Sequence, residues 1–429
     1  MAKVQCTTRQ AVTPGKQSAV ILAAEGIINT ETLPDFQAAM KAVLDQNIAR
    51  LVLNLKNLTY INSTGLGELI RNQDILKGRG GDMVLASVPQ EVIRTIKIIG
   101  FHTLIKIFPG DAQALAYFDS GSTELVEKEY QRVAPRPVAP GVPRKPVPHK
   151  PRFPRTPVDA AVMLVMPKKD IFADILAMRW GGDKPGGKFR HVTDKGTVMS
   201  SIASLKPDLM IIDNSVPDAD ALCKDVKVNK ASSMVGVIKV YGESEGRRGP
   251  LYVAEDDRVT EPFEYKELFA VAESELRRSA TKDKFAVHKM QFEIVNTDQQ
   301  IDQANDLIAT LVRQADLNEH DASEIRTAAR EALDNAYRHG NACRQDRRIV
   351  VGYTLDHEKL VITVQDEGKG FDYNFYLSLG READPEQRAR IRAREGKPGG
   401  LGIMLMMRCL TTLEYDPPGN LCRLIKKLS

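Results

Sequence analysis

Two glycine-rich segments in the last third of the chain carry residues suited to nucleotide binding. Asp366, Gly368 and Gly370 follow a strand predicted over residues 360–365. The carboxylate can accept a hydrogen bond from an amine, and the glycines allow the backbone to approach a flat ring. The second segment, Gly-Lys-Pro-Gly-Gly-Leu-Gly at 396–402, opens a predicted helix whose free N–H groups and dipole suit phosphates. Either segment alone also fits an ordinary turn.

A helix predicted over residues 323–338 precedes both segments. Glu331 and Asn335 are four residues apart, so they share one face of this helix, opposite an apolar stripe. A glutamate and an asparagine on one helical face are usually only solvated. The three groups occur in order, each on the element that nucleotide binding needs, and together they predict a nucleotide-binding domain.

A hydroxyl group near the other end of the chain stands at a predicted helix start. An alternating strand over 50–57 leads to Asn62-Ser63-Thr64-Gly65, and helical spacing of apolar residues follows. The simple interpretation is that Ser63 caps the helix, because hydroxyl residues are favoured there.

The middle of the chain alternates between strand and helix signals. Apolar runs over 162–166 and 209–212 predict buried parallel strands, and a further strand and a final helix are predicted over 235–240 and 265–276. This pattern predicts a doubly wound α/β domain, with the carboxylate of Asp213 at the end of one central strand.

Composition excludes several classes of protein. The five cysteines are scattered without metal-ligand spacing, which argues against zinc and against a disulfide framework. The net charge of +4 is too small to imply nucleic-acid binding. The sequence has no run of 18 apolar residues and no basic N-terminal region before an apolar run, so neither membrane spanning nor export is expected.

The chain of 429 residues is long enough for about three domains. Residues 131–157 contain nine prolines, seven basic residues and no acidic residue, which is typical of an extended linker. Docking of this segment on nucleic acid or on a proline-binding groove is an alternative that composition leaves open. A polar stretch over 277–284 gives a second boundary.

The first unit resembles the STAS family of anti-sigma factor antagonists. The carrying residues are Leu51 to Gly67, with the strand, the Asn-Ser-Thr-Gly-Leu-Gly motif and the helix in the family's order. The resemblance implies that Ser63 is the phosphoacceptor. The family has an aspartate where this chain has Asn62.

The middle unit resembles the receiver domains of two-component systems, with Asp213 at the phosphoacceptor position. The acidic pair that holds Mg²⁺ in receivers is replaced by Met166 and Pro167, the small hydroxyl by Tyr241, and the lysine by Glu261. The resemblance therefore implies a receiver without its chemistry, which serves as a spacer, dimerisation or docking module.

The last unit resembles the Bergerat-fold ATPases, which include gyrases, some chaperones, sensor histidine kinases and anti-sigma serine kinases. The resemblance implies that Asn335 coordinates the Mg²⁺ that bridges ATP phosphates and that Asp366 binds the adenine amino group. It also implies a lid over residues 371–398. The residues that would shape the pocket are Gly368, Gly370, Gly400, Leu401 and Gly402.

The surrounding residues favour the anti-sigma kinases among these families. A sensor histidine kinase needs a phosphoacceptor histidine on an upstream helix, whereas His288 lies in a predicted strand. In anti-sigma kinases the glutamate four residues before the Mg²⁺ asparagine is the general base, and it maps to Glu331.

The expected fold class is α/β in three domains. They are a STAS domain with a mixed sheet and helices over 1–130, a doubly wound receiver-like domain over 158–278, and a Bergerat-fold α/β sandwich over 284–429.

The resemblances imply a cytoplasmic partner-switching regulator that acts as an ATP- and Mg²⁺-dependent serine kinase of the anti-sigma type. Its expected partners are a STAS serine, in a separate protein or at Ser63 of this chain, a sigma factor, and a second copy through the kinase domain. The alternative is a nucleotide-dependent binding protein that sequesters its partner without efficient phosphoryl transfer. Glu331 favours the kinase, and Asn62 slightly favours the binding protein. A two-component relay protein is disfavoured because the acidic pair and the histidine are missing.

Overall fold

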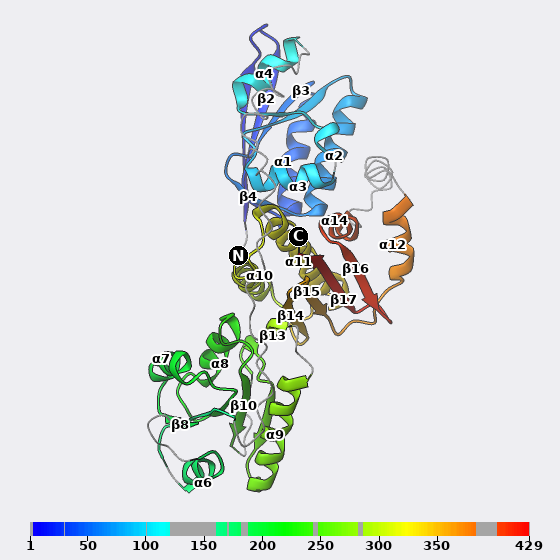
Figure 1. Ribbon diagram of the computed structural model, residues 1–429. Coiled ribbons are helices and arrows are strands. Elements are labelled where there is room, and N and C mark those ends of the chain that lie inside the picture. The colour runs from blue at the N-terminus through cyan, green and yellow to red at the C-terminus, as the bar shows by residue number, and fades with distance from the viewer. Residues whose placement is uncertain are drawn as a thin grey trace, which may run out of the picture. The chain divides into compact units, whose positions relative to one another are not determined.

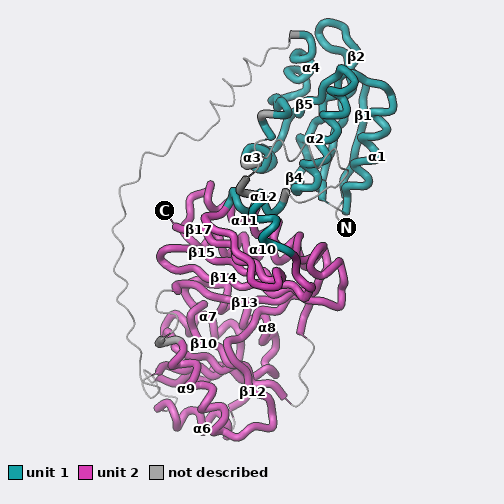
Figure 2. The backbone as a smooth tube through the Cα atoms, turned by 90° about the vertical axis from the view of Figure 1, so that its right-hand side faces the viewer, with its two compact units in different colours: residues 1–146, 372–409 teal, residues 147–371, 410–429 magenta. Residues whose placement is uncertain are grey.

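The structure is a computed structural model. It describes residues 3–29, 31–99, 101–120, 160–169, 171–181, 188–242, 248–281, 286–382 and 401–428. The chain divides into two compact units, residues 1–146 with 372–409 and residues 147–371 with 410–429 (Figure 2). The linker predicted over 131–157, most of the predicted lid and Gly400 lie outside the described residues.

A mixed six-stranded sheet forms the N-terminal part of the first unit (Figure 1). Its order is β1-β2-β3-β5-β6, with β4 beside β2. Strand β1 runs antiparallel to β2, and the other pairs are parallel. The strands are β1 (Val4–Val12), β2 (Ser18–Ile28), β3 (Arg50–Asn54), β4 (Leu58–Ile61), β5 (Asp82–Ala86) and β6 (Ile107–Phe108).

Helices cover this sheet because its central strands are apolar on both faces. Val52 and Val84, for example, pack in one cluster with Phe108 and with Ala114 of α4. The helices are α1 (Leu33–Leu44), α2 (Ser63–Gly78), α3 (Gln90–Ile99) and α4 (Asp111–Ser120). Two later helices, α12 (Tyr373–Glu382) and α14 (Leu401–Cys409), complete the unit, and α14 packs against α2 and α3.

The second unit contains a five-stranded parallel sheet of order β12-β10-β9-β7-β8. In chain order this is the 2-1-3-4-5 arrangement of doubly wound domains, as the sequence predicted. The strands are β7 (Val162–Val165), β8 (Phe189–Val192), β9 (Leu209–Asp213), β10 (Gly236–Tyr241) and β12 (Asp257–Thr260). Alternate side chains of the buried strands pack in two apolar clusters, one on each face of the sheet.

Four helices supply the outer layers of this domain. Residues of α6 and α9 pack in one cluster, and residues of α7 and α8 pack in the other. The helices are α6 (Ile171–Arg179), α7 (Lys195–Leu205), α8 (Ala219–Val228) and α9 (Tyr265–Thr281). The sheet is therefore covered on both sides, which explains why its strands are almost continuously apolar.

A six-stranded antiparallel sheet of order β11-β13-β14-β15-β17-β16 completes the second unit. Strand β14 alternates buried with half-buried residues, so one face of the sheet packs against helices. Helices α10 (Asp298–Arg313) and α11 (Glu319–Asn335) pack on this sheet. The strands are β11 (Leu251–Val253), β13 (Ala286–Val295), β14 (Arg348–Asp356), β15 (Lys359–Gln365), β16 (Thr412–Asp416) and β17 (Leu421–Lys427). These three sheets with their helices confirm the predicted α/β fold class, and His288 lies in a strand as predicted.

Strand β11 connects the two sheets of the second unit. It comes from the predicted receiver-like segment, between β10 and β12, yet it pairs with β13 of the antiparallel sheet. Arg248 donates to Glu293 on β13 at 2.9 and 3.0 Å. The side chain of Gln314 also donates to the backbone oxygen of Val228, at 3.1 Å. The boundary predicted over residues 277–284 separates two chain segments, but the sheet that follows it includes β11 from the segment before it.

We expect a fragment of residues 284–429 to lose protection along β13. The N–H of Val295 donates to the oxygen of Pro250 at 2.8 Å, and the fragment lacks that acceptor. Hydrogen–deuterium exchange of a peptide covering residues 286–295 should be at least ~10-fold faster in the fragment than in the full chain. A peptide covering β15, which has no contact with β11 in the sheet order, is the internal control. Equal protection of β13 in both proteins would show that β11 is dispensable.

Candidate functional site

Helix α11 carries the first pair of candidate residues. Its N-terminus is capped by Asn318, whose side chain accepts from the N–H of Asp321 at 2.9 Å. The helix spans 319–335, so it begins and ends a few residues before the predicted 323–338. Glu331 is buried, with 4% of its surface exposed, and Asn335 is half-buried at the last helical position.

The side chain of Asn335 is available to a ligand. Within the described residues, no hydrogen bond engages its amide. The same residues contain no group of three acidic, histidine or cysteine side chains that could hold a metal ion. Mg²⁺ is commonly held by one or two protein groups together with substrate phosphates and water. The residues present therefore fit Mg²⁺ bound with a nucleotide better than a metal site built from protein alone.

The chain leaves α11 through a π-helical turn, η2 (Ala336–Gly340). Its signature is the hydrogen bond from the N–H of Asn341 to the oxygen of Ala336, at 2.7 Å. The phenol of Tyr337 donates to Asp298 at 2.9 Å and so ties the turn to the start of α10. Such wide turns are rare and are frequent at functional sites.

The turn brings Gly340 directly against Asp366. A Cβ atom at Gly340 would lie 2.2 Å from the Cγ atom and 2.4 Å from both carboxylate oxygens of Asp366. Gly370 has a φ of +76°, and a Cβ there would lie 2.1 Å from the oxygen of Pro418. A Cβ atom at Gly370 would collide with backbone, and one at Gly340 would collide with the carboxyl group of Asp366, so a larger residue at either position requires its surroundings to move.

The carboxylate of Asp366 is held in place by its own loop. Its Oδ1 atom accepts from the N–H of Gly368 at 2.7 Å, and the N–H of Asp366 donates to the oxygen of Asn420 at 3.0 Å. Partial burial raises the pKa of Asp366, and the Gly368 N–H and Arg347 oppose that effect. A partly desolvated, oriented carboxylate is a strong acceptor for an amine.

Asn341 connects the chain segments around Asp366. The sequence analysis did not identify this residue. The residue is fully buried, and its oxygen accepts from the N–H of Glu367 at 2.9 Å. Its amide donates to the oxygen of Arg348 at 3.0 Å and to the side chain of Asn296 at 3.2 Å. Only its position directly after Gly340, at the end of the helical motif, pointed to it.

Two of the remaining nucleotide candidates belong to the other compact unit. Leu401 and Gly402 open helix α14, and Gly402 is buried. In the second unit, the structure brings together Asp366, Gly368 and Gly370, and it adds Gly340 to them.

Ser63 is the first residue of α2, but it is not the cap. The cap is Asn62, whose side chain accepts from the N–H of Gly65 at 2.9 Å. The interpretation of Ser63 as the capping hydroxyl is therefore wrong. Ser63 is 6% exposed, so an external kinase could reach it only after the surroundings of the helix start move.

In the doubly wound domain, Asp213 is the last residue of β9. The Oδ1 atom of Asp213 accepts from the N–H of Ser215 at 2.8 Å. The hydroxyl of Tyr241 is hydrogen-bonded to that of Tyr252 on β11, at 3.0 Å. The buried Lys239 pairs with Asp220 rather than with Asp213. The Tyr241–Tyr252 contact thus links β10 to β11.

Comparison with known proteins adds two domain families. Residues 10–134 match the STAS domain, and residues 294–426 match the histidine kinase-like ATPase domain. The anti-sigma F factor antagonist of Paenibacillus polymyxa is 28% identical over 75 residues, which cover 18% of this chain and 64% of that protein, less than two thirds. The BtrV protein of Bordetella bronchiseptica, described as an anti-sigma factor antagonist, is 30% identical over 90 residues, 21% of this chain and 75% of the relative.

The C-terminal part matches a different group of relatives. The anti-sigma F factor of Clostridium perfringens is 24% identical over 133 residues, 31% of this chain and 89% of the relative. Among solved structures, the receiver domain of a signal transduction histidine kinase from Syntrophus aciditrophicus is 21% identical. That match covers 28% of this chain and 91% of the other, with a TM-score of 0.22. Among the described helices, none combines the length and the apolar character needed to span a membrane.

We expect Gly340→Ala to weaken nucleotide binding. The added methyl group collides with the carboxylate of Asp366, so either the π-helical turn or the Asp366 loop has to move. Calorimetric titration should show at least ~10-fold lower ATP affinity, with a loss of about 1–3 kcal/mol in stability. Gly78→Ala is the matched control, because a Cβ there meets no atom within 4 Å. Unchanged ATP affinity in Gly340→Ala would show that Asp366 does not belong to the nucleotide site.

Asp334, beside Asn335, gives a prediction about pH. Burial raises its pKa to about 6, against the opposing charges of Arg338 and Arg330. Because this pKa is higher in the folded chain than in the unfolded one, stability falls as pH rises through the range in which Asp334 ionises. Asp334→Asn should therefore raise the free energy of unfolding by about 1–2 kcal/mol at pH 8 and change it little near pH 4.

Denaturant titrations at both pH values measure this effect. Asp346→Asn is the control of opposite sign, since Arg344 lowers the pKa of the exposed Asp346. An Asp334→Asn variant that is less stable than the parent at pH 8 would contradict the assignment.

Proposed function

We propose that this chain, which belongs to the STAS-domain family of anti-sigma factor antagonists and also contains a histidine kinase-like ATPase domain, is a partner-switching serine kinase. Its substrate is the serine of a STAS domain, either Ser63 of this chain or the matching serine of a separate STAS protein. The partner under control is a sigma factor or another protein that the ATPase domain binds. We place the protein in the cytoplasm and expect a second copy to associate through the ATPase domain.

The observation that carries this proposal is the continuity between α11 and the Asp366 pocket. Glu331 and Asn335 lie one helical turn apart, and the π-helical turn then leads directly to the contact between Gly340 and Asp366. One segment of chain thus holds, in sequence, the Glu331 carboxylate, the Asn335 amide that we propose as the Mg²⁺ ligand, and Gly340 beside the proposed adenine-binding Asp366.

Each residue has a role that its chemistry supports. ATP supplies the γ-phosphoryl group when it is bound, and its Mg²⁺ offsets the negative charge of the phosphates. The Asn335 oxygen would hold that Mg²⁺, and the Asp366 carboxylate would accept from the adenine amine. Glu331 would take the proton of the serine hydroxyl as the serine oxygen bonds to phosphorus and the bond to the departing ADP breaks. Burial of Glu331 keeps water away from this carboxylate.

Phosphorylation would act as a switch through charge. A phosphoserine adds about two negative charges at neutral pH. Placed at the start of α2, it would meet the positive end of that helix and would repel acidic groups on a docked partner. The STAS surface would then leave the ATPase domain, which is free to bind its other partner.

The alternative is a nucleotide-dependent binding protein that transfers phosphate slowly or not at all. The low exposure of both Ser63 and Glu331 favours it, because transfer needs the hydroxyl and the carboxylate to meet at the γ-phosphate. The two functions differ in whether phosphate appears on serine.

We expect Glu331→Gln to separate binding from catalysis. Removal of a general base typically lowers the rate by about 10²–10⁴-fold, whereas Mg-ATP affinity should stay within about threefold. Asn335→Ala should instead abolish the Mg²⁺-dependent part of ATP binding. Glu319→Gln on the same helix is the matched control, since Glu319 is exposed and pairs with Arg326.

Mass spectrometry after incubation with Mg-ATP measures the transfer. Phosphate on Ser63 in the parent chain, absent in Ser63→Ala and Glu331→Gln, supports the kinase with an internal substrate. Phosphate found only on an added STAS protein keeps the kinase and discards Ser63 as its substrate. If neither Ser63 nor the added STAS protein carries phosphate while Mg-ATP binds normally, the result supports the alternative of a nucleotide-dependent binding protein.

A further inference from the structure

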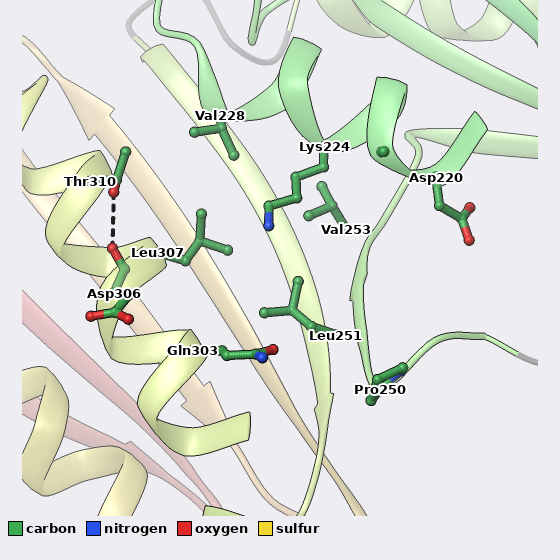
Figure 3. Close-up of a pocket in the computed structure, with 11 residues that line it drawn as sticks. Asp220, Lys224, Val228, Pro250, Leu251, Val253, Gln303, Asp306, Leu307 and Thr310 are labelled. Atoms are coloured by element: carbon green, nitrogen blue, oxygen red, sulfur yellow. Dashed lines mark hydrogen bonds between the residues drawn. The ribbon is translucent and has the colours of Figure 1, made fainter. Parts of the chain in front are cut away.

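A groove lies away from the nucleotide pocket, between α8 of the receiver-like domain and α10 of the ATPase domain (Figure 3). Strand β11 runs along its floor. Its volume is about 560 Å³, within the range of about 300–1,000 Å³ that small-molecule sites occupy. All of its lining residues belong to the second compact unit.

The floor and lower walls of the groove are apolar. Leu251 and Val253 are two residues apart on β11, so both side chains lie on the same face of the strand. Val228 and Leu307 approach from α8 and α10. Tyr252, between the two floor residues, belongs to the other side of the strand, where it bonds to Tyr241. The groove thus offers an apolar strip for aliphatic groups.

The two walls offer opposite charges. Lys224 extends from α8, while Asp306 and Gln303 come from α10 (Figure 3). In the part of the chain that the structure describes, no hydrogen bond or ion pair engages the Lys224 ammonium, the Asp306 carboxylate or the Gln303 amide. The remaining charged residue of the lining, Asp220, is already paired with Lys239.

These features select the charge pattern of a ligand. A nucleotide or another polyanion does not fit, because the lining has one ammonium group and two carboxylates. A neutral apolar molecule would contact the floor but would gain no electrostatic interaction with the two charged walls, whose Lys224 and Asp306 side chains are exposed to solvent. The complementary ligand has an apolar middle, an anionic end for Lys224 and a cationic end for Asp306.

We propose that the groove binds a short peptide with free termini and aliphatic side chains. The peptide carboxylate would pair with Lys224, the terminal ammonium with Asp306, and the side chains would cover Leu251 and Val253. This site is distinct from the nucleotide pocket and does not depend on the proposed kinase activity.

The position of the groove gives such a ligand access to both domains. Strand β11 pairs with β13, and α10 packs against α11, which carries Glu331 and Asn335. A bound peptide would therefore lie one helix away from the proposed catalytic residues. On this proposal, the receiver-like domain would respond to a bound ligand instead of to phosphorylation of Asp213.

Methyl-detected NMR of the full chain with unmodified trileucine as the probe tests the proposal. We expect saturable shifts of the Leu251, Val253, Leu307 and Val228 methyl groups. Lys224→Met and Asp306→Asn should each lower the affinity about two- to fivefold, because both side chains are exposed, and trileucine blocked by acetylation and amidation, which loses both ion pairs, should bind the parent chain about tenfold more weakly. Lys195→Met is the control, because Lys195 pairs with Asp225 outside the lining.

Three results would overturn the proposal. The first is the absence of saturable shifts with trileucine at millimolar concentration. The second is a set of shifts confined to methyl groups outside the groove. The third is equal binding of free and blocked trileucine, which would show that the two charges do not take part. The blocked peptide uses the unaltered chain, so this comparison does not depend on how the variants fold.

Discussion

The pairing of β11 with β13 is the interaction on which the architecture of the second unit depends. An edge strand presents unpaired N–H and C=O groups, and a sheet that leaves them open invites pairing with another chain. Here the receiver-like domain supplies the covering strand from the connection between β10 and β12, where a doubly wound domain would ordinarily have a helix. Side chains in and just before β11 pair with residues of the two neighbouring strands. Tyr252 on β11 meets Tyr241 at the end of β10, and Arg248 before the strand meets Glu293 on β13.

Side chains beside this strand also compensate a buried charge in the doubly wound domain. The buried Lys239 pairs with Asp220, and its ammonium lies over the rings of Tyr241 and Tyr252, 5.1 and 5.7 Å from their centroids. A desolvated ammonium needs such compensation from an opposite charge and from aromatic faces.

Much of the fold could be predicted from the sequence because its signals are local. The apolar runs of β7 and β9 and the helical stripe of α11 each reflect burial of nearby residues, whereas β3, expected to alternate, is buried on both faces. Strand β11 could not be predicted in this way, because three residues are too few for a periodic pattern and its partner lies about 40 residues further on. The role of Gly340 was missed for the same reason, since it becomes visible only once the π-helical turn brings it to Asp366. At Ser63 the sequence misplaced the cap by one residue, because asparagine and serine are both good capping residues.

The uncharged cap of α2 has an electrostatic consequence of its own. Within α2, which the structure describes throughout, the first turn has no acidic side chain, and the capping position is held by the neutral Asn62. A carboxylate at that position would already neutralise part of the helix dipole and would repel a dianion bound to the next residue. With asparagine as the cap, the field at the helix start is left for the first anion that arrives. An amide in place of a carboxylate at the cap thus leaves the start of α2 with a more positive electrostatic potential.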